Sequence, residues 1–203
     1  MPFNSPIFID HNKTYKADTC TPLKNAAKEG LINFIGVKRG LYPGMELPEN
    51  HLPGINSIGI WDITEPQDWG LDWHRNEGIE LTFLENGTLP FEVTSNRKHL
   101  LEPNDLTITR PWQTHRVGVP NVGVSRLYWI ILDVGVRRPH QEWKWPNWII
   151  LSDDDLQHLT HMMRKNEEPV WHTSTDILHC FHSIGKSLAQ VIEGGSPSKL
   201  GIH

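Results

Sequence analysis

The chain has 203 residues, 37% of them hydrophobic, and a formal net charge of −5. This length and composition predict a packed core in one domain with a smaller appendage. A duplex-DNA-binding domain usually carries a basic surplus, because phosphate neutralisation supplies much of its affinity. The acidic balance therefore argues against DNA binding by this chain itself, although the chain could be joined to a DNA-binding domain.

Neither the amino-terminal residues nor the apolar content of the chain suggests export or a membrane. The two cysteines, Cys20 and Cys180, show no CxxC spacing, which favours a reducing compartment. The amino-terminal residues lack the basic segment and apolar run of a signal peptide. The longest apolar stretch, residues 127–136, is too short to cross a bilayer and contains Asp133. We expect a cytoplasmic protein with no membrane partner.

The first 150 residues read as short strands separated by turns. Residues 1–60 contain apolar pieces such as "LINFIGV" and "INSIGIW" between Gly- and Pro-containing turns. Further strands are predicted at 79–85, 88–94 and 105–110, and the apolar residues 124–134 indicate a buried central strand. The sequence "ENG" before residue 88 is a hairpin signal. Short strands at this spacing predict a sandwich or barrel.

After residue 150 the spacing of apolar residues becomes helical. Ser152 is a good N-cap and three aspartates follow it, as suits the positive end of a helix. A second helix is predicted to begin near Thr173 and to end at Gly194 and Gly195, with Pro197 preventing continuation. Its apolar residues recur at spacings of four and three. They form a narrow seam that includes Ile177, Phe181, Ile184 and Leu188. We expect this seam to make a dimer contact; packing onto the chain's own barrel is the alternative.

A candidate site lies in the segment "WHRNEGIELTFLENG", residues 73–87. His74, Asn76 and Glu80 share one face if this segment is extended, because side chains alternate along a strand. Pro111 is expected to set a turn that brings His115 to the same place. Imidazole and carboxylate groups suit zinc, iron, manganese or nickel, but an amide is a poor ligand. The alternative is a set of polar groups that hydrogen-bond to each other or to an organic ligand.

Aromatic and cationic residues lie close to this candidate site in the sequence. Trp73 and Trp112 adjoin the motif residues, and indole rings line many small-molecule pockets, although core packing is the simpler role for a tryptophan. Arg110 is placed to bind an anionic effector, or it is an ordinary charge at a strand end. We expect ligand-binding residues at Trp73, His74, Asn76, Glu80, Arg110, Trp112 and His115.

Two segments resemble the motifs of the cupin superfamily. Residues 74–87 are similar to the first cupin motif, with Asn76 where the second histidine belongs. Residues 103–115 are similar to the second motif and end in His115, but Asn104 replaces its usual glycine and Val119 its closing asparagine. The resemblance implies a cupin-like double-stranded β-helix, or jelly-roll barrel, in a mainly β protein.

The stretches 52–63, 67–87, 106–118 and 127–146 together resemble the amino-terminal sensor domains of AraC-type transcriptional regulators. The likeness covers residues 30–190. It implies a barrel that binds a small effector, two following helices that dimerise, and a helix-turn-helix pair that binds DNA. The aromatic residues near the site suit a sugar as this effector. We expect a barrel in 1–150, a helical dimerisation segment in 151–195, and in 196–203 the start of a linker to a DNA-binding domain absent from this sequence.

These observations predict a non-enzymatic, homodimeric sensor that meets DNA only through the absent domain. No cofactor is required by this hypothesis, although a divalent metal ion at His74, Glu80 and His115 stays open. The alternative is a metal-dependent cupin enzyme, an oxygenase or isomerase, that uses the same three residues.

Overall fold

The structure is a computed structural model that describes residues 7–11, 13–18, 20–48, 51–94, 97–137 and 141–194. Its strands are β1 (Ile7–Asp10), β2 (Lys13–Lys16), β3 (Asn33–Lys38), β4 (Met45–Glu46), β5 (Ile55–Ile63), β6 (Leu71–His74), β7 (Ile79–Gly87), β8 (Leu89–Val93), β9 (Arg97–Leu101), β10 (Asp105–Thr109), β11 (His115–Val117), β12 (Ser125–Leu132) and β13 (Val170–His172). Its helices are α1 (Thr21–Lys28), α2 (Asp153–Lys165) and α3 (Thr175–Ile192).

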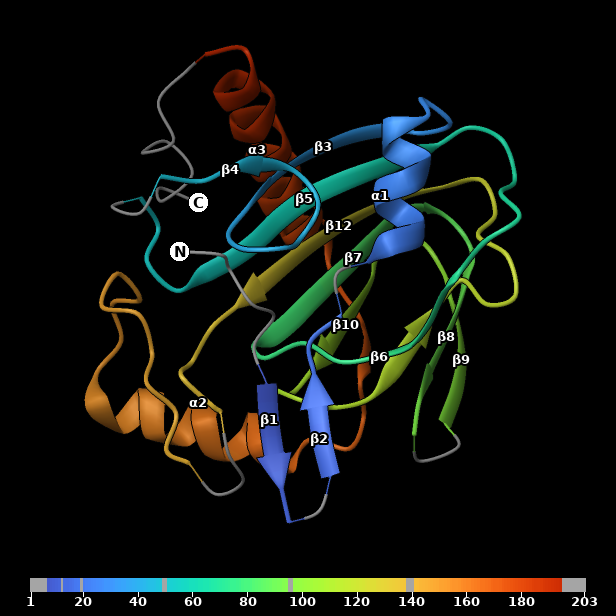
Figure 1. The fold of residues 1–203 in the computed structure, drawn as a ribbon. Helices are drawn as coiled ribbons and strands as arrows, with labels where there is room; N and C mark the ends of the chain where they lie inside the picture. The colour runs from blue at the N-terminus through green and yellow to red at the C-terminus, as the bar shows by residue number, and fades with distance from the viewer. Residues whose placement is uncertain are drawn as a thin grey trace.

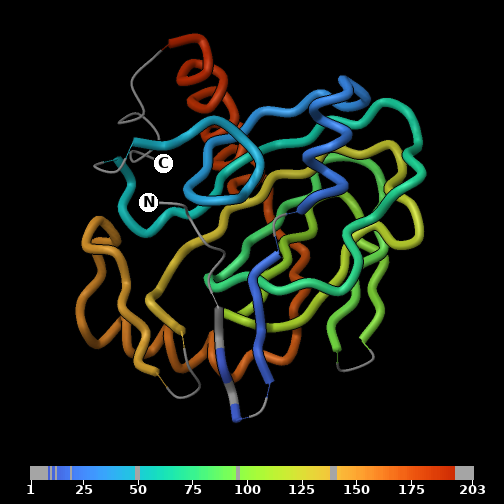
Figure 2. Tube along the Cα trace, viewed as in Figure 1, coloured from blue at the N-terminus to red at the C-terminus, as the bar shows by residue number. Residues whose placement is uncertain are grey.

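The strands form a mainly β, cupin-like barrel with two facing sheets (Figures 1 and 2). The larger sheet has the order β13-β10-β7-β12-β5-β3-β4, and the smaller has the order β6-β11-β8-β9. The predicted central strand is β12, which pairs antiparallel with both β5 and β7. The strands expected at 79–85, 88–94 and 105–110 are present as β7, β8 and β10.

Alternation along the strands divides the apolar residues between two cores. Trp61, Leu84 and Leu127 point between the two sheets, where they meet Phe91 and Val117 of the smaller sheet. The opposite face of the larger sheet presents a second apolar set, which includes Val37, Ile60, Phe83 and Tyr128. The molecule therefore has three layers, with α3 covering the outer face of the larger sheet (Figure 1).

The apolar residues of α3 that were predicted to form a dimer seam lie against the larger sheet. Phe181 and Leu188 are buried in the second core, and Ile177 and Ile184 pack against it. The Phe83 and Phe181 rings stack with centroids 4.8 Å apart. The seam thus packs onto the chain's own barrel, which was the alternative, and Phe181 and Leu188 have no free apolar surface for a second copy.

Both carboxy-terminal helices begin at serine caps. The Ser152 hydroxyl accepts a hydrogen bond from the Asp155 amide, as predicted for α2. Helix α3 begins near Thr173, as predicted, and its cap is Ser174, whose hydroxyl accepts from the Asp176 amide. Gly195, Pro197 and the expected linker at 196–203 lie outside the described residues. No helix in the described part of the chain is long and apolar enough to cross a membrane.

The expectation of strands alone before residue 60 missed α1. This helix has eight residues, a proline in its first turn and only two buried side chains, Leu23 and Ala26. Such a short segment shows little helical periodicity. The helix matters for function because Leu23 helps to close the interior of the barrel.

Candidate functional site

Three strands bring His74, Glu80 and His115 together inside the barrel. His74 ends β6 and is the cross-strand partner of His115 on β11, and their ring centroids are 4.2 Å apart. Glu80 comes from β7 of the larger sheet, and its Oε2 lies 2.7 Å from His115 Nε2. The candidate ligand atoms of the three residues all lie within 4.8 Å of one another. The predicted cluster is therefore present, and it bridges the two sheets.

Backbone carbonyls fix the orientation of both imidazole rings. His74 Nδ1 lies 2.7 Å from the Asp72 carbonyl, and His115 Nδ1 lies 2.9 Å from the Gln113 carbonyl. A carbonyl oxygen can only accept, so each Nδ1 carries a proton and Nε2 is left as the remaining ring nitrogen. His115 Nε2 is buried and, despite its closeness to Glu80, makes no well-formed hydrogen bond. This is the arrangement that outer contacts impose on metal-ligating histidines.

The pKa values of the two histidines shift in opposite directions. Burial, reinforced by His115, lowers the pKa of His74 to about 4. Burial also opposes protonation of His115, but the Glu80 carboxylate outweighs it and raises the pKa of His115. Burial would raise the pKa of Glu80, whereas His115 and His74 reverse this effect and lower it. Without a metal ion, these shifts favour the charged forms of His115 and Glu80 together and the neutral form of His74.

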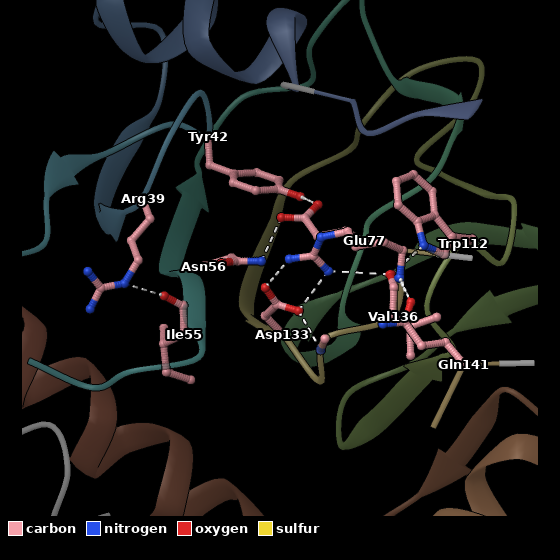
Figure 3. A network of polar contacts seen from close by, with 11 residues as sticks. Arg39, Tyr42, Ile55, Asn56, Glu77, Trp112, Asp133, Val136 and Gln141 are labelled. Carbon is pink, nitrogen blue, oxygen red and sulfur yellow. Dashed lines mark hydrogen bonds and ion pairs between the residues drawn. The ribbon is translucent and has the colours of Figure 1, made fainter. Parts of the chain in front are cut away.

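A second polar group, centred on Glu77, adjoins the histidine cluster. Asn76 Nδ2 donates to Glu80 Oε2 at 2.6 Å, and the Tyr42 hydroxyl lies 3.4 Å from Asn76 Oδ1. The same hydroxyl donates to Glu77 at 2.5 Å, and Asn56 Nδ2 donates to the other Glu77 oxygen at 2.6 Å (Figure 3). Burial raises the pKa of Glu77. Asn76 thus links His74, Glu80 and His115, which together form the centre of the site, to the buried Glu77 carboxyl group and to the loop that carries Tyr42.

The interior next to the centre is small and closed. The cavity that Glu80 and Thr82 line has a volume of about 20 Å³. Its remaining walls are Cys20, Leu23, Tyr42, Pro43, Trp61, Leu71, Val117, Leu127, Trp129 and Ile131. A space of this size holds about one water molecule. A sugar does not fit into this cavity in this conformation.

Of the seven predicted ligand-binding residues, Glu80 alone lines this cavity; His74, Asn76 and His115 cluster around Glu80, whereas Trp73, Arg110 and Trp112 lie elsewhere. Trp73 points the opposite way from His74, as alternation requires, and its exposed ring lies under the Arg116 guanidinium at 4.7 Å. Trp112 joins the second core and donates to the Val136 carbonyl at 2.8 Å (Figure 3). Arg110 binds the Arg164 carbonyl and Glu167 at the end of α2. Their assignment to the pocket was wrong, because nearness in sequence does not give the same face.

Other residues of the site were not predicted. Tyr42, Glu77 and Cys20 come from a loop, a turn and the start of a short helix, where no strand alternation indicates direction. Glu77 was adjacent to predicted residues, and its charge beside an apolar strand was the available signal. Thr82, two residues after Glu80 on β7, lines the cavity and hydrogen-bonds to Thr107 at 2.5 Å between their hydroxyl oxygens.

The residues present fit a divalent metal ion. Two imidazoles and one carboxylate form a donor set used by iron, zinc, manganese and nickel. The buried His115 Nε2 faces the Glu80 carboxylate at 2.7 Å, and both Nδ1 atoms are already held by backbone carbonyls. His74, Glu80 and His115 would hold the ion, and Asn76 would orient the carboxylate.

Comparisons with known proteins give distant likeness in structure. No protein-family profile matches the chain, and no curated protein matches its sequence. The bacterial pirin YhhW from Escherichia coli, solved with nickel(II), has a TM-score of 0.42 and 18% identity, over 53% of this chain and 47% of that protein. A cupin superfamily protein from Desulfitobacterium hafniense has a TM-score of 0.36 and 12% identity, over 50% and 78% of the two chains. A protein of unknown function from Streptococcus pyogenes has a TM-score of 0.37 and 9% identity, over 65% and 97%.

Proposed function

We propose that the chain is the effector-sensing domain of an AraC-type transcriptional regulator, and that His74, Glu80 and His115 are the point in its barrel where ligand is recognised. One observation carries the proposal: strand β7 contributes residues both to the cluster of His74, Glu80 and His115 and to the contact with helix α3. Glu80 faces the cavity from β7, and Phe83, three residues on, stacks on Phe181 of α3 behind the sheet. A shift of β7 at Glu80 would therefore reach α3 through the contact of Phe83 with Phe181.

The mechanism of such a sensor is linkage between two sites. A ligand that touches Glu80 biases α3 only if it binds two arrangements of the domain with different affinity. The rigid stacking of Phe83 on Phe181 suits this role, because packed cores shift between discrete arrangements. The likeness of residues 30–190 to AraC-type sensor domains supports the assignment. Homodimerisation and DNA contact through a further domain belong to this proposal.

The test uses the polypeptide encoded by the complete reading frame. We expect the frame to continue into two helix-turn-helix segments and the product to shift a DNA fragment from upstream of its own gene. The binding constant should fall steeply with salt, because phosphate contacts release counterions. A frame without such segments, or binding no stronger than to unrelated DNA, would exclude the regulator.

A second candidate, the metal-dependent cupin enzyme, is favoured by the convergence of three ligand atoms within 4.8 Å. When bound, a divalent ion would act as a Lewis acid with open coordination positions. The chain's own part would be to hold the ion through His74, Glu80 and His115 and to keep bulk water out of the small cavity.

Metal analysis separates the two candidates at the first step. The enzyme requires near-stoichiometric metal in purified protein, lost in His115→Ala and retained in His158→Ala, a control on the exposed surface of α2. Metal-free protein that does not bind added zinc or nickel would count against the enzyme and leave the sensor standing. Oxygenase or isomerase turnover by the metal-loaded protein would decide for the enzyme.

A further inference from the structure

A loop separates the closed centre from an open hollow on the surface. The outer hollow, of about 340 Å³, lies between α1, β3 and residues 40–44. Tyr42 and Pro43 line both this hollow and the inner cavity of about 20 Å³. Figure 1 shows α1 and the β3–β4 connection over the same side of the barrel. Two side chains of one loop therefore form the wall between the surface and the centre.

Hydrogen bonds from two lysines and the buried side chain of Tyr42 hold this loop in place. Lys24 of α1 donates to the Leu41 carbonyl at 2.9 Å, and Lys38 of β3 donates to the Gly40 carbonyl at 2.8 Å. The Tyr42 hydroxyl bonds to Glu77 beneath the loop. Glycines at both ends, Gly40 and Gly44, have positive φ values of 64° and 121°. Such glycines can change backbone conformation at low steric cost.

We propose that residues 40–44 form a lid, and that its opening joins the outer hollow to the centre as a site for a small carboxylate ligand. The outer hollow alone reaches the lower size range of small-molecule sites. Lys24 and Lys38 lie at its rim, and Glu80, whose carboxylate is paired with His115, lines the inner end. Phe34, Trp61 and Trp129 supply apolar walls. This inference deepens the proposed sensor function by naming its ligand class, and it rests on that function only for the biological role of the ligand.

The two lysines couple ligand binding to opening of the lid, because they can donate either to lid carbonyls or to the ligand. In the closed structure their ammonium groups are used on lid carbonyls, and Lys38 also pairs with Glu46 at 2.5 Å. A carboxylate accepts stronger, charge-assisted hydrogen bonds than a neutral carbonyl. A ligand that takes over these donors releases the lid, so it binds the open arrangement better than the closed one.

Cys20 reports on the opening, because its buried thiol lines the inner cavity. The exposed Cys180 is removed as Cys180→Ser. The rate at which iodoacetamide alkylates Cys20 is then measured by mass spectrometry in the EDTA-treated chain. We expect Lys24→Met and Lys38→Met each to raise this rate about threefold to tenfold, the effect of one hydrogen bond on an opening equilibrium. Lys28→Met, on the exposed side of α1, is the matched control and should leave the rate unchanged.

Urea unfolding of each variant separates lid opening from global unfolding. The lid is supported if alkylation accelerates while the free energy of unfolding stays constant. Rates equal to the parent, or a rise no larger than the loss of global stability explains, overturn the lid. Failure of Cys20 to react in any folded variant overturns it as well.

The ligand class is tested with matched probes in the same assay. Lactate and benzoate carry a carboxylate, and propane-1,2-diol and benzyl alcohol are their neutral counterparts. We expect at least one of the carboxylates to protect Cys20 by occupying the opened site, with the protection lost in the Lys24→Met, Lys38→Met double variant. Protection by the alcohols alone, or by no probe, overturns the carboxylate assignment. None of these readouts uses DNA or added metal, so they are independent of the tests of the proposed function.

Discussion

Asn76 holds Glu80 in place: its Nδ2 donates to Glu80 Oε2 over 2.6 Å, and Glu80 Oε2 is also the atom nearest His115 Nε2. The amide that replaces a histidine in the cupin-like motif therefore acts on the carboxylate. Such outer contacts fix the orientation of metal ligands.

For the chain with zinc bound, Asn76→Ala should weaken zinc affinity by about 10- to 100-fold, the usual cost of losing an orienting contact. Asn76→His should raise the affinity, because it offers a third imidazole. Competition with a chromophoric chelator measures both, and Asn147→Ala, at an exposed position, is the control. Equal affinities for the parent and Asn76→Ala would show that Asn76 does not orient Glu80 toward metal.

In metal-free protein, stability should fall as the pH drops from about 6.5 to about 4. Burial holds the pKa of His74 at about 4, below its ordinary value of 6.5, so the unfolded chain takes up this proton first. Glu80, with its pKa lowered from 4.5, acts at the acid edge of this window and below it, and His115, with its raised pKa, acts above it. Glu77, with its pKa raised from 4.5, acts in the opposite sense to His74 and reduces the net loss. The loss from His74 should be on the order of 3 kcal/mol.

Urea unfolding in EDTA between pH 4 and 7 measures this loss. His74→Gln should flatten the profile in that window, and His158→Gln on the surface should not. A parental profile that is already flat would contradict a neutral, buried His74.

The periodicity of the sequence predicted the strands and the cluster of polar residues, but it did not predict which residues close the cavity beside them. His74, Asn76, Glu80 and His115 were grouped correctly, but not for the reason given by one extended strand: His74 ends β6, Glu80 lies on β7 of the other sheet, and Asn76 lies in the connection between them. Tyr42 and Cys20 could not be found this way, because they lie in a loop and beside a short helix whose positions depend on tertiary packing. The regular spacing of apolar residues in α3 predicted a buried seam. It could not show whether the chain's own sheet or a second copy of the chain covers this seam.

Gly59 and Trp129 are cross-strand partners, and the absence of a side chain on Gly59 makes room for the indole. A Cβ at position 59 would lie 2.1 Å from Trp129 Cζ2. Gly59→Ala should therefore destabilise the chain by about 1–3 kcal/mol, the cost of overpacking a core. Gly123→Ala, where the nearest atom is 3.9 Å away, should change stability by no more than about 0.5 kcal/mol. Urea unfolding compares the two variants, and a similar loss in both would argue against tight packing of Trp129 on Gly59.

Leu188 is fully buried between α3 and the larger sheet, whereas Ile192, one turn on, is exposed. Leu188→Ala should lower the free energy of unfolding by about 2–5 kcal/mol, because it removes buried methyl groups and leaves a cavity. Ile192→Ala should cost less than about 1 kcal/mol. Unfolding at several protein concentrations distinguishes the two roles weighed for this seam. If the seam serves the chain's own core, the loss from Leu188→Ala is independent of concentration; if the loss grows at high concentration and vanishes at low concentration, Leu188 instead belongs to a contact between two copies.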